Sequence, residues 1–316
     1  GGSKDSRVTA NTNVVLKSGT VTNVFGGGLG TSTTNAKVTQ QGANVENIYG
    51  GGYGGTGNGG TTANATVNID SGKVENVYGG SMSKGITKNA IINIRGTSLI
   101  TNKIYGGGYK TDIGKSDNSG STTINISGGT INKDLFGGAE GAVVHGITNI
   151  NIGVDAVSDN SPVAGNINIR GNIYGGGTST SVDYSLNSVE GDTHITMTNS
   201  TRSPITFSKN IFGSGKGTNY STNNTNNDGS TIKLNNFGTS RSSYRMTSIQ
   251  RTGKVSIGNS YLELSGAQDN YNYYRNTLYT LNRVTKGLAL HDNTTLYTRR
   301  GFNMVGGFES YLTDAS

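Results

Sequence analysis

The sequence predicts an all-β fold: a right-handed parallel β-helix with irregular loop insertions and a capping C-terminal region. Only 31% of the 316 residues are hydrophobic and 51 are glycine, which argues against a thick globular core. A glycine-rich signature recurs along the chain, and short alternating segments separate its copies. No stretch of comparable length has the apolar period and the caps of a helix. The chain has 16 tyrosines and only 14% charged residues, a composition unlike that of disordered proteins.

The glycine signature consists of a β-branched residue, Asn, an aliphatic residue, an aromatic residue and then glycines. Full or partial copies occupy residues 21–28, 45–52, 74–80, 101–108, 135–138, 172–177 and 210–213. From aromatic to aromatic the steps are 24, 29, 27, 31, 38 and 38 residues. A strand signature at such steps, with no helix for a crossover, is typical of a coil whose rungs stack on one another.

The second signature is an aliphatic-polar-aliphatic triplet, usually followed by glycine. It occurs at residues 67–69, 92–94, 124–126, 150–152, 167–169 and 195–197. This period-two alternation predicts short strands with one buried face. The shortest step suits a rung of about three strands of roughly five residues, so the longer steps imply insertions. Gly- and Ser-rich stretches at 53–60, 109–121 and 176–188 mark where these insertions are expected.

The repeated residue types have structural interpretations. Glycine tolerates positive φ and has no Cβ, so a run of three suits a sharp corner or a close approach of two backbones. Asn23, Asn47 and Asn76 recur at one place in the rung and are expected to stack as an amide ladder. The repeated tyrosines are expected to be core or corner residues: Tyr49, Tyr78, Tyr105 and Tyr174.

Three segments are predicted. Residues 1–14 are expected to hold a vector-derived remnant and an N-terminal cap, and residues 15–232 the glycine-rich solenoid repeats. After about residue 232 the glycine signature fades while alternation persists, so residues 233–316 are expected to form divergent terminal rungs and a cap of the same solenoid. We expect the chain to be a monomeric segment of a longer surface protein.

Composition excludes several classes of protein. The chain has no cysteine, which rules out disulfides and thiolate metal sites. It has no apolar run of 18 residues, so no transmembrane span and no membrane insertion are expected. The formal net charge is +7, with most of the excess in residues 233–316. This basic end could meet anionic polymers or could be a solvated face. We expect no nucleic-acid partner.

Motifs for catalysis, cofactors and metals are weak. Residues 52–57 have the spacing of a dinucleotide-binding loop, but no helix follows to bind the phosphate. His145, His194 and His291 lie far apart, which gives no support for a zinc site. The acidic residues before residue 233 are scattered singly. We therefore predict no catalytic residue, no cofactor and no metal, and keep a polysaccharide lyase or glycoside hydrolase as an alternative.

Exposed tyrosines are the predicted ligand-binding residues, because an aromatic ring can stack on a sugar ring. Tyr53 and Tyr109 are expected in inserted loops, where they would be accessible. A second candidate cluster near the C-terminal end consists of Tyr271, Tyr273, Tyr274 and Arg275. Unlike the repeated tyrosines, which are expected in the core or at corners, these residues are expected at the surface.

The Val-x-Asn-Val-Tyr-Gly-Gly-Gly units, alternating with Ile-Asn-Ile-Ser-Gly-Gly, resemble the glycine-rich repeat regions of large surface proteins of Gram-positive bacteria. The resemblance covers roughly residues 15–312 and is one of repeat style. It implies display outside the cell, attached to the cell wall or secreted, often with an adhesive role. The expected function is thus that of an adhesin segment that binds host or neighbouring-cell glycans or proteins. A structural spacer with no ligand is the first alternative.

Overall fold

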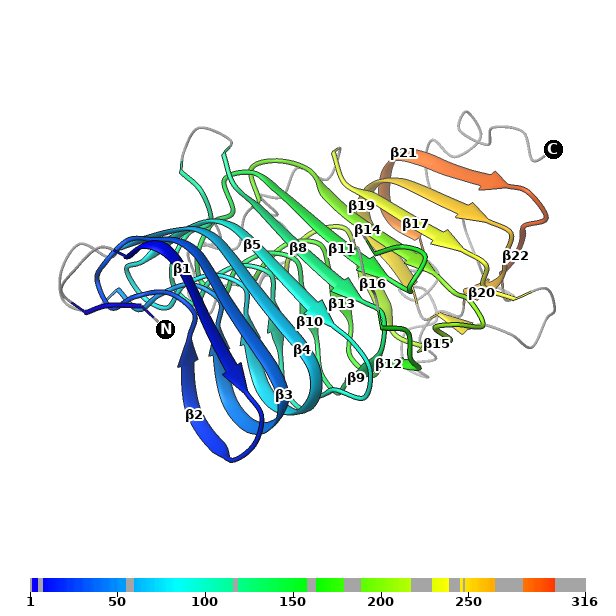
Figure 1. Cartoon of the computed structure of the whole chain (residues 1–316). Helices are drawn as coiled ribbons and strands as arrows, with labels where there is room; N and C mark the ends of the chain where they lie inside the picture. The colour runs from blue at the N-terminus through cyan, green and yellow to red at the C-terminus, as the bar shows by residue number, and fades with distance from the viewer. Residues whose placement is uncertain are drawn as a thin grey trace, which may run out of the picture.

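The computed structural model describes residues 2–4, 8–54, 60–115, 119–157, 163–178, 189–216, 229–238, 245–246, 248–264 and 281–298. These residues contain strands and turns and no helix. The strands stack parallel to one another, and in Figure 1 they follow one another along the coil from the N-terminal to the C-terminal end. The predicted parallel β-helix is confirmed, and its right-handed sense stays a prediction.

Each turn of the coil has three faces, and the chain enters each turn on the first face. Strands of this face pair in parallel with those of the next turn. They are β1 (Val8–Leu16), the first parts of β3 (Thr33–Tyr49) and β4 (Thr61–Tyr78), β5 (Ile86–Ile94), β8 (Ser121–Ile126), β11 (Ile147–Ile152), β14 (Thr193–Thr198), β17 (Thr231–Asn235) and the last parts of β19 (Ser248–Gly258) and β21 (Leu281–His291).

The second and third faces have shorter strands. The second face contains the start of β2 (Thr20–Phe25), the middle of β3 and β4, β6 (Leu99–Ile100), β9 (Gly129–Ile131), β12 (Ile167–Ile169) and β15 (Ile205–Phe207). The third face contains the ends of β2, β3 and β4, β7 (Ile104–Tyr105), β10 (Leu135–Phe136), β13 (Ile173–Tyr174), β16 (Asn210–Phe212) and the starts of β19 and β21. A separate parallel sheet contains β18 (Arg245–Met246), β20 (Tyr261–Leu264) and β22 (Thr295–Thr298).

Aliphatic side chains of all three faces meet in a narrow core. On the first face one inward position is filled by the same type of residue in every turn, and each of these side chains is at most 2% exposed: Val38, Val67, Ile92, Ile124, Ile150, Ile195, Ile232, Val255 and Leu288. Since the strand spacing of about 4.8 Å places identical residues in contact, the core is a set of vertical ladders. The period-two alternation of the sequence therefore predicted the buried face correctly.

Glycine corners follow the third face, and close backbone approach explains them. A Cβ on the first glycine of a corner would collide with the carbonyl oxygen of the first glycine in the next turn, for example Gly50 against Gly79 and Gly106 against Gly137. In the described part of the chain these corner glycines do not have positive φ. Of the two reasons considered for the glycine run, the close approach of neighbouring backbones is the one that applies.

Asparagine side chains of successive turns form ladders, as predicted for Asn23, Asn47 and Asn76. The Asn47 amide donates to the Asn23 side-chain oxygen at 3.1 Å, and Asn76 donates to Asn47 at 2.9 Å. A second ladder joins Asn68, Asn93, Asn125 and Asn151 at 2.8–2.9 Å. A third joins Asn11, Asn35, Asn64 and Asn89 at 2.7–3.1 Å. Each amide satisfies the next, which stabilises the stacking of one turn on another.

The terminal turns lose the glycine corner because the strands become continuous. β19 pairs with β16 on the third face through residues 248–250 and with β17 on the first face through residues 254–258. β21 repeats this course and pairs with β19 along most of its length, with an irregularity at residues 252–254 of β19. A strand that passes directly between the two faces has no corner, which explains why the signature fades after residue 232.

At the other end, β1 begins at Val8, ahead of residue 15. The Gly2 amide donates to the Gly27 carbonyl at 3.1 Å, and the Leu29 amide donates to Ser3 at 3.0 Å. Gly2 and Ser3 thus make the same backbone hydrogen bonds with residues 27 and 29 that one glycine corner makes with the corner of the next turn. Among the described residues there is no helix that is long and apolar enough to cross a membrane.

Candidate functional site

A ladder of aromatic rings lies outside the aliphatic core, along the third face. In each turn the aliphatic residue before the ring points inward, so the next side chain on the strand points outward. The rings stack with centroid distances of 4.7–5.3 Å and interplanar angles of 3–11°. We call this set the aromatic ladder: Phe25, Tyr49, Tyr78, Tyr105, Phe136, Tyr174 and Phe212. Apart from the half-buried Phe25, its members are at most 9% exposed.

A second row of residues covers the aromatic ladder. Each member follows its ring by four residues, just after the glycine corner, and pairs in parallel with the equivalent residue of the next turn. We call this set the covering row: Leu29, Tyr53, Met82, Tyr109, Glu140, Thr178 and Lys216. The corner glycines turn the chain back towards the rings, and two members of the covering row, Met82 and Tyr109, pack against the ring cluster.

Members of the covering row contact rings of preceding turns. The Tyr53 ring lies 5.7 Å from Phe25, and the Tyr109 ring meets Tyr78 edge-on at 5.6 Å. Glu140 reaches further, because its Oε2 accepts a hydrogen bond of 2.6 Å from the Tyr78 hydroxyl. These contacts fix the orientation of side chains that remain partly accessible.

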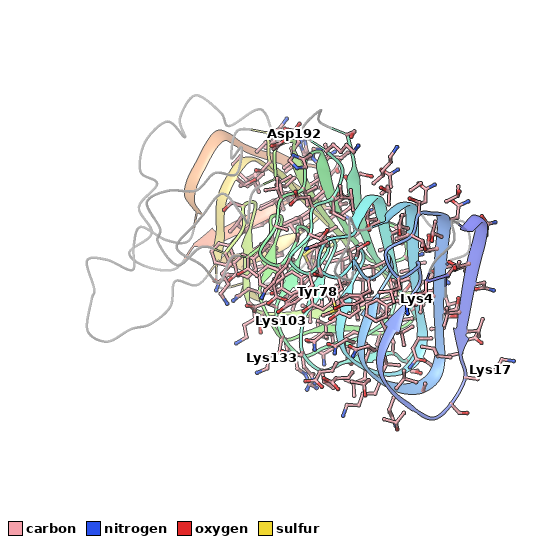
Figure 2. The ribbon with its side chains drawn as sticks, turned by 90° about the vertical axis from the view of Figure 1, so that its left-hand side faces the viewer. Lys4, Lys17, Tyr78, Lys103, Lys133 and Asp192 are labelled. Carbon is pink, nitrogen blue, oxygen red and sulfur yellow. The ribbon has the colours of Figure 1, made fainter. Side chains whose placement is uncertain are left out.

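Charged groups border the covering row. Lys103 Nζ lies 4.0 Å from Glu140 Oε1, and Figure 2 labels Lys103 and Tyr78, whose side chains both reach this carboxylate. Lys110 Nζ lies 5.2 Å from the centre of the Tyr109 ring. At this distance an ammonium group is attracted by the face of the ring. The surface therefore combines exposed aromatic edges with donors and an acceptor.

The buried tyrosines resist ionisation. Burial raises the pKa of Tyr49 to about 12, with smaller contributions from Tyr109 and nearby carboxylates. Burial, the hydrogen bond to Glu140 and the charge of Glu140 together raise the pKa of Tyr78 well above its usual range. For Tyr105, burial is again the main cause of a raised pKa, and Glu140 and Asp134 add to it. These hydroxyls stay protonated at neutral pH, and that of Tyr78 donates to Glu140.

The structure corrects the predicted location of Tyr53 and Tyr109. Both belong to the covering row, in register with their equivalents in other turns, and neither lies in an inserted loop. Tyr53 is 38% exposed, whereas Tyr109 is partly buried against the rings. The other predicted cluster, Tyr271, Tyr273, Tyr274 and Arg275, lies outside the described residues.

Comparisons with known proteins give no relative. No protein-family model matches the chain, and neither a curated protein nor a solved structure is similar to it at a significant level.

Other carboxylates of the described residues that make ion pairs do so with basic side chains one or two turns away. Asp70 pairs with Arg95 at 3.3 Å, and Asp134 pairs with Lys216 at 2.9 Å. His145 lies between two acids, with Nδ1 at 2.9 Å from Glu190 and Nε2 at 3.6 Å from Asp112. Within the described ranges there is no group of three or more His, Asp or Glu side chains that could hold a metal ion.

Sequence reasoning missed Glu140 and Lys103, and the covering row as a whole. Its members range from Leu and Tyr to Glu and Lys, so no single residue type marks the row. The available signal was the constant spacing of four residues after each aromatic residue. The Tyr78–Glu140 hydrogen bond joins residues 62 positions apart, a separation that local patterns do not reveal.

Two conservative substitutions should have opposite effects on stability. Tyr78→Phe removes the donor to Glu140 and is expected to lower the free energy of unfolding by about 2 kcal/mol. Tyr105→Phe should leave stability unchanged or raise it by up to about 1 kcal/mol, because the buried Tyr105 hydroxyl has no partner among the described residues. Urea denaturation of both variants checks this, and equal destabilisation would contradict the assigned hydrogen bonds.

Proposed function

We propose that the chain is an extracellular, non-catalytic binding segment that uses the covering row to contact host or neighbouring-cell glycans or proteins. The observation that carries the proposal is the accessible Tyr53 ring, held against Phe25 on a rigid stack of rings. An aromatic ring fixed in this way can stack on a sugar ring without losing conformational entropy.

The geometry favours a linear ligand aligned with the coil. Tyr53 and Tyr109 occupy equivalent positions two turns apart, with Met82 between them. From the strand spacing, their backbones are about 10 Å apart along the axis. Beside this row lie Lys103, which contacts Glu140, and Lys110, which contacts Tyr109. Their ammonium groups can donate hydrogen bonds to hydroxyl groups of a ligand, and the Glu140 carboxylate can accept one.

The pairing of the carboxylates supports a role without catalysis. Glycosidases need two carboxyl groups that face one substrate bond, one of them acting as a proton donor. Here Glu140 is engaged by Tyr78 and Lys103, while Asp70 and Asp134 face basic groups. We also propose that the chain binds its ligand as a monomer, without a nucleic-acid partner and without insertion into a membrane.

The test is a broad array of glycans and extracellular-matrix proteins, followed by titration of the selected ligand with two variants. Tyr53→Ala is expected to weaken binding roughly tenfold, because the ring contact is lost. Tyr53→Phe is the matched control and should bind within about twofold of the parent, because the ring is kept. If the array is silent, a spacer without a ligand is the better account. If Tyr53→Ala binds as well as the parent, the chain binds its ligand elsewhere and the covering row is not the binding surface.

A further inference from the structure

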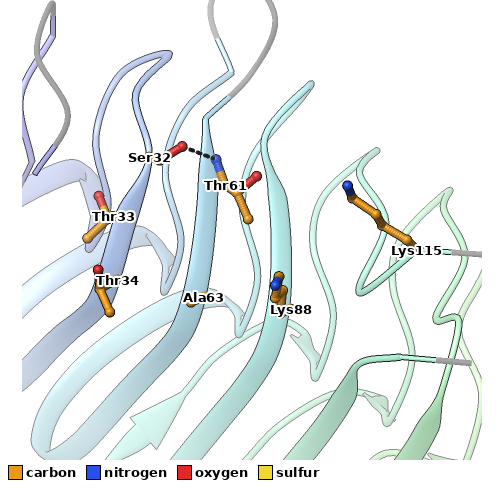
Figure 3. A pocket seen from close by; sticks show the side chains of 7 residues that line it. All are labelled: Ser32, Thr33, Thr34, Thr61, Ala63, Lys88 and Lys115. Atoms are coloured by element: carbon orange, nitrogen blue, oxygen red, sulfur yellow. Dashed lines mark hydrogen bonds between the residues drawn. The ribbon is translucent and has the colours of Figure 1, made fainter. Parts of the chain in front are cut away.

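A polar cavity lies at the start of the first face, where β3, β4 and β5 begin. Its volume is about 310 Å³, and Figure 3 shows the seven side chains that line it. They are Ser32, Thr33, Thr34, Thr61, Ala63, Lys88 and Lys115. No member of the covering row lines this cavity, so it is separate from the surface of the proposed function.

The strand register explains the hollow. Thr33 pairs with Thr62 and Asn35 with Asn64, which places Thr34 beside Ala63. The pairing of β4 with β5 then places Lys88 beside Ala63 on the other side. A methyl group between two longer side chains leaves space above it. On one wall, Ser32 Oγ accepts a hydrogen bond of 3.3 Å from the Thr61 amide.

The described lining of the cavity is positively charged. Two ammonium groups, Lys88 and Lys115, line it, and the lining contains no carboxylate. Among the residues that the structure describes, neither lysine forms an ion pair. Figure 3 shows Lys115 extending towards the strand that carries Lys88. Two ammonium groups that line one cavity, with no carboxylate among its described lining residues, attract an anion.

We propose that this cavity binds one unit of an acidic saccharide, with Lys88 and Lys115 holding a sulfate or carboxylate group and the hydroxyl of Ser32 bonding a ring substituent. The volume suits a single ring with its charged group. The lining has no aromatic side chain, whereas single-stranded nucleic-acid sites need rings on which bases stack. The same oxyanion chemistry serves sulfated sugars and uronates.

Titration calorimetry of the intact chain with defined oligosaccharides tests the proposal. The probes are a sulfated oligosaccharide, a uronate oligosaccharide, the uncharged parent oligosaccharide, inorganic sulfate and a single-stranded oligonucleotide. At least one of the two acidic oligosaccharides should bind at least about tenfold more tightly than the uncharged one, and the preferred one identifies the charged group. Equal or tighter binding of inorganic sulfate or of the oligonucleotide would overturn the assignment to a saccharide.

Variants locate the site. Lys88→Gln and Lys115→Gln are each expected to weaken binding about tenfold, because each removes one of the two ammonium groups that line the cavity. Lys37→Gln removes an exposed charge of β3 that does not line the cavity and should change affinity less than twofold. An equal effect of Lys37→Gln would show general charge attraction and overturn the proposal. Binding of neutral glycans through Tyr53 is independent of these results.

Discussion

Replacing Gly106 with alanine is expected to lower the free energy of unfolding by about 3 kcal/mol or more. The added Cβ would collide with the Gly137 carbonyl oxygen of the next turn and lie 3.0 Å from the Thr122 side chain. The turns cannot separate easily to make room, because the Gly106 amide donates to the Phe136 carbonyl at 2.8 Å. Urea denaturation followed by circular dichroism measures the loss.

Gly141→Ala is the matched control. Gly141 has a φ of +66°, and a Cβ there would meet only the Lys110 Cγ, at 3.7 Å. The cost should be about 1 kcal/mol, the usual penalty for alanine in the left-handed region. A loss at Gly106 no greater than this would mean that the corners are not held by close backbone contact.

Ile150→Ala should be similarly disruptive, with an expected loss of about 3–4 kcal/mol. Ile150 is fully buried and pairs with Ile124 in the turn before it and Ile195 in the turn after it. Truncation leaves a cavity in the middle of this ladder, and the hydrogen-bonded strands on both sides limit its collapse. The same denaturation measurement applies.

The control lies on the same strand. Ile147 is 41% exposed at the start of β11, and Ile147→Ala should change the free energy of unfolding by less than about 0.5 kcal/mol. Similar losses for both variants would show that the inward direction of Ile150 has been assigned wrongly.

The coil was predictable because stacking requires like residues at equivalent positions. Ile124 and Ile150 each stand in an Ile-Asn-Ile triplet, and Asn23 and Asn47 each stand two residues before an aromatic residue. Such repetition is visible in a single sequence. The course of the terminal turns was not predictable, because a direct passage of β19 between two faces leaves no signature other than the absence of the glycine corner.

The candidate site was predicted only in part, for a physical reason. Core positions demand one shape and one polarity, whereas a covering position needs only to lie over a ring, so Met82 and Glu140 can both serve. Tyr53 was found because aromatic residues are conspicuous, but its place in the rung was not. The cavity at Lys88 depends on the alignment of three strands, which the sequence alone did not fix.

The measurement that tests the central claim most directly exposes the purified chain to one panel of polysaccharides and extracellular-matrix proteins and records retention and new reducing ends together. The proposed binding function predicts selective retention of at least one polymer, with no release of product and with retention reduced by Tyr53→Ala. New reducing ends would contradict it in favour of a polysaccharide-degrading enzyme, and retention of none of the polymers or matrix proteins would contradict it in favour of a spacer.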